Sequence, residues 1–240
     1  MCNLYRVCIL CLMMQAAPSC SSPGEFVPRE GDLVFVTAQG SPFSEAVADA
    51  TAQGDSLKFD HVAIAAGTGG ETCIIEATPS GGVARRSWSD FTASFRSGDG
   101  GQGFIVKRVT VDFPVRDAIR AAESHIGEEY DWSYLPGNGR MYCSELVYES
   151  YRGYDGRPLF HAVPMNFRNA DGELPAFWKE LFEALGEPVP EGVPGTNPND
   201  MSKEPVLKEV YRYLPRTAVG SIGGGNSDAS RTTDSAGGSN

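Results

Sequence analysis

Apolar residues occur along this chain in short blocks separated by turn-forming residues, a pattern that predicts several short strands. Residues 33–36 (Leu-Val-Phe-Val) follow a Glu-Gly-Asp turn and predict a buried strand. Residues 61–66 and 71–77 are apolar runs separated by the glycine-rich segment 67–70, which predicts a β-hairpin. A further strand is predicted at 103–110. These segments together indicate an antiparallel sheet.

Other segments repeat their apolar residues every three or four positions, which predicts helices. The predicted helices lie at 41–51, 114–126, 144–151 and 174–185. In the first of them, Ser41 is the expected N-cap and Pro42 the first helical residue. Helices mixed with antiparallel strands, without any internal repeat, indicate an α+β fold.

The first twenty residues predict an export signal. Arg6 is followed by the apolar run 7–14 and then by small residues that end at Cys20. The run is too short to anchor the chain by spanning a bilayer. A cysteine directly after the small residues resembles the bacterial lipoprotein signal, which implies that 1–19 are removed and that a lipid on Cys20 holds the protein to a membrane of the cell envelope. Plain secretion and an uncleaved apolar N-terminus remain the alternatives.

The last segment, 216–240, consists mostly of Gly, Ser, Thr and Asn, with little apolar surface to bury. Such a composition predicts a flexible tail. Residues 20–215 remain, a length that fits a single domain.

The composition of the chain argues against some classes of binding partner. The chain is 41% hydrophobic and 21% charged, with a net charge of −11. An acidic chain without a basic cluster is not expected to bind nucleic acid, because phosphate contacts need clustered Lys and Arg. The same charge argues against docking on anionic lipid through a basic face.

The hairpin brings a histidine and a carboxylate together. If 67–70 closes it, Ala66 faces Glu71 and His61 faces Glu76, with Cβ atoms about 4.5–5.5 Å apart. Glu76 lies in an apolar strand, where a charge needs a partner. The pair is either an oriented histidine or an ion pair on a solvated face. Asp60 also adjoins His61, but alternation along a strand directs it to the opposite face.

A second feature is Cys143, which opens the helix predicted at 144–151. A helix N-terminus stabilises a thiolate over a thiol, and its free N–H groups can hold an oxyanion. The alternative is a buried structural cysteine, an interpretation that suits Cys73 in the hairpin. In an exported protein the two cysteines could also pair as a disulfide.

Cys143, His61 and Glu76 thus form a candidate nucleophile, base and orienter. Spacing alone does not show that Cys143 meets His61. A family resemblance supports contact between Cys143 and His61. The resemblance rests on short stretches that occur in this order: Gly31-Asp32-Leu33-Val34-Phe35, Asp60-His61-Val62-Ala63-Ile64, Ile74-Ile75-Glu76-Ala77, Tyr130-Asp131 and Tyr142-Cys143-Ser144-Glu145-Leu146-Val147.

That series resembles the permuted NlpC-type, papain-like cysteine hydrolases of the YiiX/YaeF-like amidase group. The resemblance implies a circularly permuted papain-like fold in which the histidine precedes the cysteine and the nucleophile helix packs on an antiparallel sheet. It assigns Cys143 as nucleophile, His61 as base and Glu76 as the polar third member.

Aromatic residues supply further candidates. Tyr142 and Tyr130 are candidates for donating to the oxyanion or for lining the cleft. Trp132, Tyr134 and Phe160 form either a substrate wall or part of the core.

The remaining polar residues are interpreted as structural. His125 and His161 are expected at the surface or at caps, Asp32 in a turn, and Glu145 as a helix-capping carboxylate. No set of residues has the spacing of a zinc site, so neither a metal nor another cofactor is predicted.

The expected function is therefore hydrolysis of an amide bond through a thioester on Cys143, with a cell-wall peptide or muropeptide as the first candidate substrate. Transfer or hydrolysis of a lipid or amine-linked acyl group on the same residues is one alternative. A non-catalytic domain that binds muropeptide or lipid is another. The sequence leaves the oligomeric state open.

Overall fold

The computed structural model describes residues 26–52, 54–67, 72–96 and 102–214. The predicted signal 1–19, the predicted lipid anchor Cys20 and the predicted tail 216–240 lie outside these residues. None of the helices in the described segments is both long enough and apolar enough to cross a membrane.

The fold is built on a six-stranded antiparallel sheet with the strand order β4-β3-β2-β1-β5-β8. Its strands are β1 (Leu33–Thr37), β2 (Phe59–Ala66), β3 (Cys73–Thr78), β4 (Gly82–Ser87), β5 (Phe104–Val109) and β8 (Leu207–Tyr213). A separate two-stranded ladder joins β6 (Val163–Pro164) to β7 (Pro194–Gly195). The α+β architecture expected from the sequence is confirmed.

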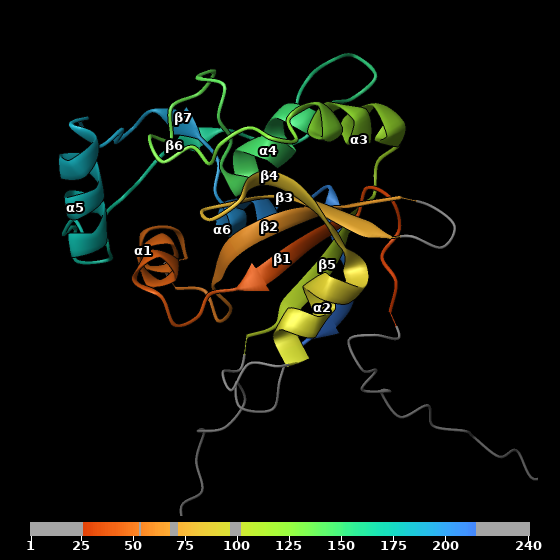
Figure 1. Cartoon of the computed structure of the whole chain (residues 1–240), viewed down its shortest axis with the longest axis horizontal. Helices are drawn as coiled ribbons and strands as arrows, with labels where there is room; N and C mark the ends of the chain where they lie inside the picture. Colours follow the sequence, from red (N-terminus) through yellow and green to blue (C-terminus); the bar gives the residue numbers. More distant parts are fainter. Residues whose placement is uncertain (1–25, 53, 68–71, 97–101, 215–240) are drawn as a thin grey trace, which may run out of the picture.

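Helices cover both faces of the sheet. They are α1 (Pro42–Thr51), α2 (Trp88–Arg96), α3 (Val115–Ser124), α4 (Cys143–Ser150), α5 (Ala176–Leu185) and α6 (Pro198–Ser202). Figure 1 shows α3 and α4 together on one side of the sheet, and α2 away from them on the other side. The predicted cap of α1 is present, since the Ser41 side chain accepts a hydrogen bond from the Ser44 N–H.

Alternation along the central strands divides the core into two layers. On β2, Val62 and Ile64 belong to the larger apolar cluster, which includes residues of α3 and α4. Ala63 belongs to the smaller cluster, which contains Trp88 and other residues of α2. Because both faces of the central strands are buried, the strands read as continuous apolar runs in the sequence.

The alternation breaks near the start of β2. Phe59 and Val62 are three residues apart, yet both belong to the larger cluster. Val36 pairs with His61 and the adjacent Thr37 pairs with Phe59, so Asp60 is an extra residue in β2. A β-bulge of this kind bends the strand and redirects side chains.

Six elements of the described residues were not expected from the sequence: β4, α2, β6, β7, α6 and β8. β4 and β8 are the two edge strands of the sheet. Edge strands carry charged side chains that discourage pairing with other chains, and this hides the apolar pattern. The pairs Arg85-Arg86 in β4 and Lys208-Glu209 in β8 are examples.

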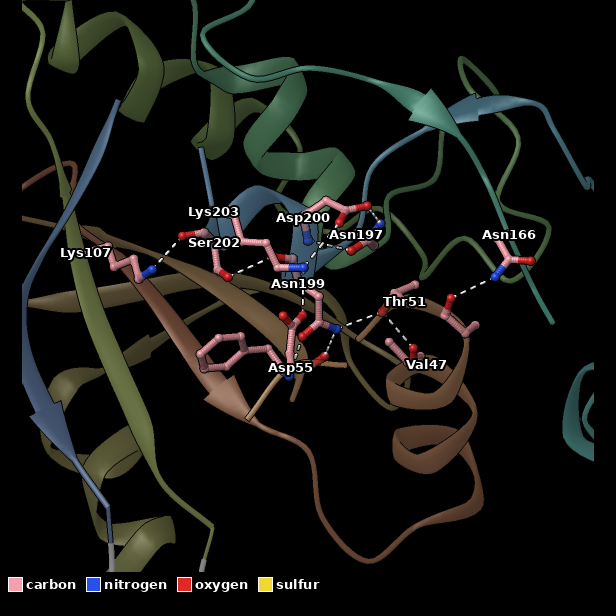
Figure 2. Close-up of polar contacts among 12 residues, drawn as sticks. Val47, Thr51, Asp55, Lys107, Asn166, Asn197, Asn199, Asp200, Ser202 and Lys203 are labelled. Carbon is pink, nitrogen blue, oxygen red and sulfur yellow. Dashed lines mark hydrogen bonds and ion pairs between the residues drawn. The ribbon is translucent and has the colours of Figure 1, made fainter. Parts of the chain in front are cut away.

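A buried asparagine from α6 fixes the strand beside the bulge. Asn199 Oδ1 accepts from the Phe59 N–H at 2.8 Å, and Asn199 Nδ2 donates to the Phe59 carbonyl and to Thr51 Oγ1, each at 2.7 Å. Figure 2 shows Asn199 reaching from α6 toward Thr51 of α1. The amide thus satisfies the backbone of Phe59, one residue from Asp60 and two from His61.

We expect Asn199→Asp to lower the free energy of unfolding by about 2–4 kcal/mol, because it keeps the shape but removes two donors from buried acceptors. Chemical denaturation measures the loss. Asn166→Ala is the control, since Asn166 also bonds α1, at the Ala50 carbonyl, but is exposed. Equal losses in the two variants would contradict this role of Asn199.

Candidate active site

Cys143 is the first residue of α4, with Tyr142 as the N-cap. The cysteine is 5% exposed, and its helix packs against β2 and β3. Its sulfur therefore lies at the positive end of the helix dipole, beside the N–H groups of the first turn, which have no partner within the helix.

His61 lies between Cys143 and Glu76. His61 Nε2 is 2.7 Å from Glu76 Oε2, and the His61 side chain also hydrogen-bonds Cys143. With Nε2 on the carboxylate, Nδ1 is the ring nitrogen left for the sulfur. The structure thus brings together the three residues that the sequence singled out.

The register that produces this contact differs from the expected one. Ala66 faces Cys73, two positions beyond the expected Glu71, and Ile64 faces Ile75. Extended to the start of β2, this register makes His61 and Glu76 diagonal neighbours instead of a facing pair. The shift is an even number of residues, so both side chains stay on one face. Diagonal neighbours about 7–8 Å apart are within reach of long side chains.

The charges of the pair support an ionised site. Burial alone would lower the pKa of His61, but its hydrogen bonds to Cys143 and Glu76 raise it to about 10. Burial opposes the charge on Glu76, yet His61 and Arg86 together lower the pKa of that carboxyl. His61 is therefore an imidazolium at neutral pH, and it places a positive charge beside the Cys143 sulfur.

Two cavities meet at this group. A narrow cavity of about 50 Å³ contains Cys143 in its wall, and a wider groove of about 240 Å³ contains His61, Glu76 and Arg86. The residues that line both are Phe43, Asp60 and Tyr130. Cys143 and His61 therefore lie beside two adjacent cavities, a narrow one with several aromatic side chains in its wall and a wider groove that contains the charged residues.

The tyrosine candidates both line the narrow cavity. The Tyr142 hydroxyl accepts a hydrogen bond from the Thr196 N–H at 3.1 Å, so it has a structural role in holding the backbone of Thr196. Burial raises the pKa of Tyr130 well above its usual value, so its hydroxyl keeps its proton. Tyr134 also lines this cavity, whereas Phe160 packs on Tyr151 in the core.

Asp60 lies at the site, although strict alternation along the strand predicted that it would point to the opposite face from His61. The bulge makes it line both cavities, and its Oδ1 is buried without a hydrogen-bond partner. Burial raises the pKa of Asp60, although a hydrogen bond from Ser44 opposes this. No pattern in the sequence marks the bulge, so this position was not predictable from periodicity.

The segment after α4, to which the sequence assigned no chemistry, supplies one wall of the narrow cavity. Its contributions are Met165, Asn166, Phe167, Trp178, Thr196, Asn197 and Pro198. These side chains come from the loops around β6 and β7 and from α5 and α6. Lining residues spread over separate elements leave no compact motif.

Other polar residues lie as the sequence indicated. Asp32 is buried and binds Arg108 through Nε at 2.6 Å and Nη2 at 2.7 Å. His125 Nδ1 contacts Glu128, and His161 is 79% exposed beside Glu204. Cys73 does not pair with Cys143; its sulfur donates to the Ala66 carbonyl.

The described residues contain no group of three or more His, Cys, Asp or Glu side chains that could hold a metal ion.

An antiparallel sheet whose histidine strand precedes a cysteine helix defines the permuted papain-like class of proteins. A family model described as permuted papain-like amidase enzyme, YaeF/YiiX, C92 family, matches residues 27–211, and the chain belongs to this family. The uncharacterized protein YiiX of Escherichia coli strain K12 is 23% identical over 191 residues, which cover 78% of this chain and 88% of YiiX.

A crystal structure described as that of the metalloprotein YiiX from Escherichia coli O157:H7 has the same fold. Its TM-score is 0.62 at 22% sequence identity, and the match covers 78% of this chain and 99% of that one.

We expect iodoacetamide to alkylate Cys143 at least tenfold faster than Cys73 at neutral pH, because thiolate content governs the rate. Access to solvent predicts the reverse order, since Cys143 is buried and Cys73 is half-buried. Mass spectrometry of the two peptides measures both rates. His61→Ala should abolish the difference, and equal rates in the unmodified chain would refute the thiolate.

Glu145 brings little negative charge to the start of α4 at neutral pH. It is 5% exposed, and the Tyr142 N–H donates to its Oε2 at 3.4 Å. Burial, together with the neighbouring carboxylate of Asp131, raises the pKa of Glu145 to about 8. The side chain is therefore largely protonated at neutral pH.

A raised carboxyl pKa lowers stability as the pH rises from about 4.5 to about 8, because the folded state holds the proton that the unfolded state has lost. Glu145→Gln removes this dependence. We expect the variant to gain on the order of a few kcal/mol relative to the original chain between pH 4.5 and pH 9. Denaturation at both pH values measures the gain, and Glu183→Gln on the exposed face of α5 should show none.

Proposed function

We propose that this protein is a cysteine amidase in which Cys143 is the nucleophile, His61 the general base and acid, and Glu76 the residue that orients His61. The observation that carries the proposal is the position of His61, which hydrogen-bonds Cys143 on one side and Glu76 on the other. Membership of the permuted papain-like amidase family supports amide-bond hydrolysis.

The reaction follows from this arrangement. The Cys143 thiolate attacks the carbonyl carbon, and the N–H groups at the start of α4 stabilise the oxyanion. The C–N bond then breaks, and the leaving nitrogen takes the proton from His61. His61 next takes a proton from water as the oxygen attacks the thioester, which releases the acid and regenerates the thiolate.

In this proposal, the two cavities bind different parts of the substrate. The narrow cavity beside Cys143 receives the acyl side, and the groove beside His61 receives the leaving amine. A cell-wall peptide or muropeptide is the first candidate substrate. The lipoprotein-type signal supports a location in the cell envelope, with a lipid on Cys20 as the link to a membrane.

Transfer or hydrolysis of an apolar acyl group is the second candidate, and the aromatic lining of the narrow cavity favours it. Phe43, Tyr130, Tyr134, Phe167 and Trp178 offer a wall that suits an alkyl chain better than a charged peptide. A purely binding role is less economical, because it leaves the buried ionised His61 and Glu76 without a function.

A substrate assay tests the proposal. We expect the protein, but not Cys143→Ala, to release new amino groups from purified peptidoglycan or to cleave an acyl-lipid amide or ester. The first result identifies a cell-wall amidase, and the second an acyl hydrolase. Retained binding without turnover of either would overturn the enzymatic proposal.

A further inference from the structure

The proposed mechanism gives no role to Arg86, a cationic side chain of the groove. Arg86 on β4 lines it together with His61 and Glu76. Arg86 Nη2 is 2.7 Å from Glu76 Oε1, while His61 occupies the other carboxylate oxygen, Oε2. Each oxygen of Glu76 thus has its own cationic partner.

The sheet and α2 together fix this contact. Glu76 faces Ala84 on β4, so Arg86 is a diagonal neighbour on the same face. The Arg86 guanidinium carbon lies 4.9 Å from the centre of the Phe91 ring on α2, an arrangement that favours a cation–π interaction. Its neighbour Arg85 points the other way and pairs with Glu123.

The charge on Arg86 matters when His61 gives up its proton. At that moment Glu76, whose side chain is 6% exposed, would be a buried carboxylate beside a neutral ring. A guanidinium does not deprotonate in proteins, so Arg86 keeps Glu76 ionised whether His61 is charged or not. It also shares the carboxylate's charge, which limits how tightly His61 holds its proton.

We propose that Arg86 is a positioning residue of this site: it fixes the Glu76 carboxylate and keeps it charged, and through Glu76 it sets the orientation and charge of His61. This inference rests on the proposed roles of Cys143, His61 and Glu76. Arg86 itself is not assigned a contact with the reacting atoms.

Several titratable groups line the groove with Glu76 or contact His61. His61 and Asp60 come from β2, Arg86 from β4, Tyr130 from the loop before α4, and Cys143 from α4 beyond His61. Among the described residues of α2, those that line the groove are Phe91, Ser94 and Phe95, which carry no charge. Asp60 is the other carboxyl, so the experiment must separate it from Glu76.

The test measures the rate of Cys143 alkylation by iodoacetamide between pH 4 and 9 in the full chain, which needs no substrate. We expect Arg86→Gln to move the acid limb of this profile about one pH unit upward, because Glu76 then loses its charge at higher pH. The rate below the limb falls about tenfold. Arg86→Lys should restore much of the shift, since it returns the positive charge.

Controls separate this role from packing and from Asp60. Arg85→Gln should leave the profile unchanged, and Arg86→Gln should add nothing in a Glu76→Gln background. A uniform fall in rate with an unmoved limb, or a further shift in the Glu76→Gln background, would overturn the inference. Where Arg86→Gln does not fold, Arg86→Lys and the NMR titration of His61 in that variant decide it.

The outcomes distinguish the two levels of proposal. An unreactive Cys143 in the unmodified chain refutes the proposed function itself. A reactive Cys143 that needs His61 but is indifferent to Arg86→Gln refutes the role of Arg86 alone.

Discussion

The arrangement of this site depends on one constraint: the carboxylate of Glu76 is buried in a central layer of the molecule and must remain charged. A lone ionised carboxylate in such a place is strongly unfavourable, so its neighbours are selected to compensate it. His61 from the strand on one side and Arg86 from the strand on the other each bind one oxygen. The sheet order β4-β3-β2 therefore fixes the order of charges from guanidinium to carboxylate to imidazolium.

Much of this was predictable from residues close together in the sequence. Ser41-Pro42 marked the start of α1, the apolar runs marked β1, β2, β3 and β5, and the pair His61 and Glu76 followed from a hairpin with strict alternation. The contact survived a register error of two residues because alternation repeats every two residues. An error of one residue would have put the two side chains on opposite faces.

The rest depended on features without a local pattern. The sequence did not indicate a role for Arg86, because an edge strand rich in charged residues resembles a loop. Within that strand, the pair Arg85-Arg86 places one arginine on each face of the sheet. Asp60 was excluded by the alternation rule that the bulge breaks. The meeting of Cys143 with His61 required the family resemblance, because no spacing rule links residues 82 positions apart. The wall of the narrow cavity depends on tertiary contacts of residues 165–198, which composition does not encode.

Asn199 makes the start of β2 depend on a part of the chain that is synthesised late. It supplies the backbone partner of Phe59 across 140 positions of sequence, next to the bulge and the histidine. Contacts that distant cannot form until nearly the whole domain has left the ribosome, whereas the β2–β3 hairpin is available early. The nascent chain therefore carries its histidine and its cysteine for some time before the backbone beside the histidine has this partner. A chain truncated before α6 would keep both side chains but lack this support for the start of β2.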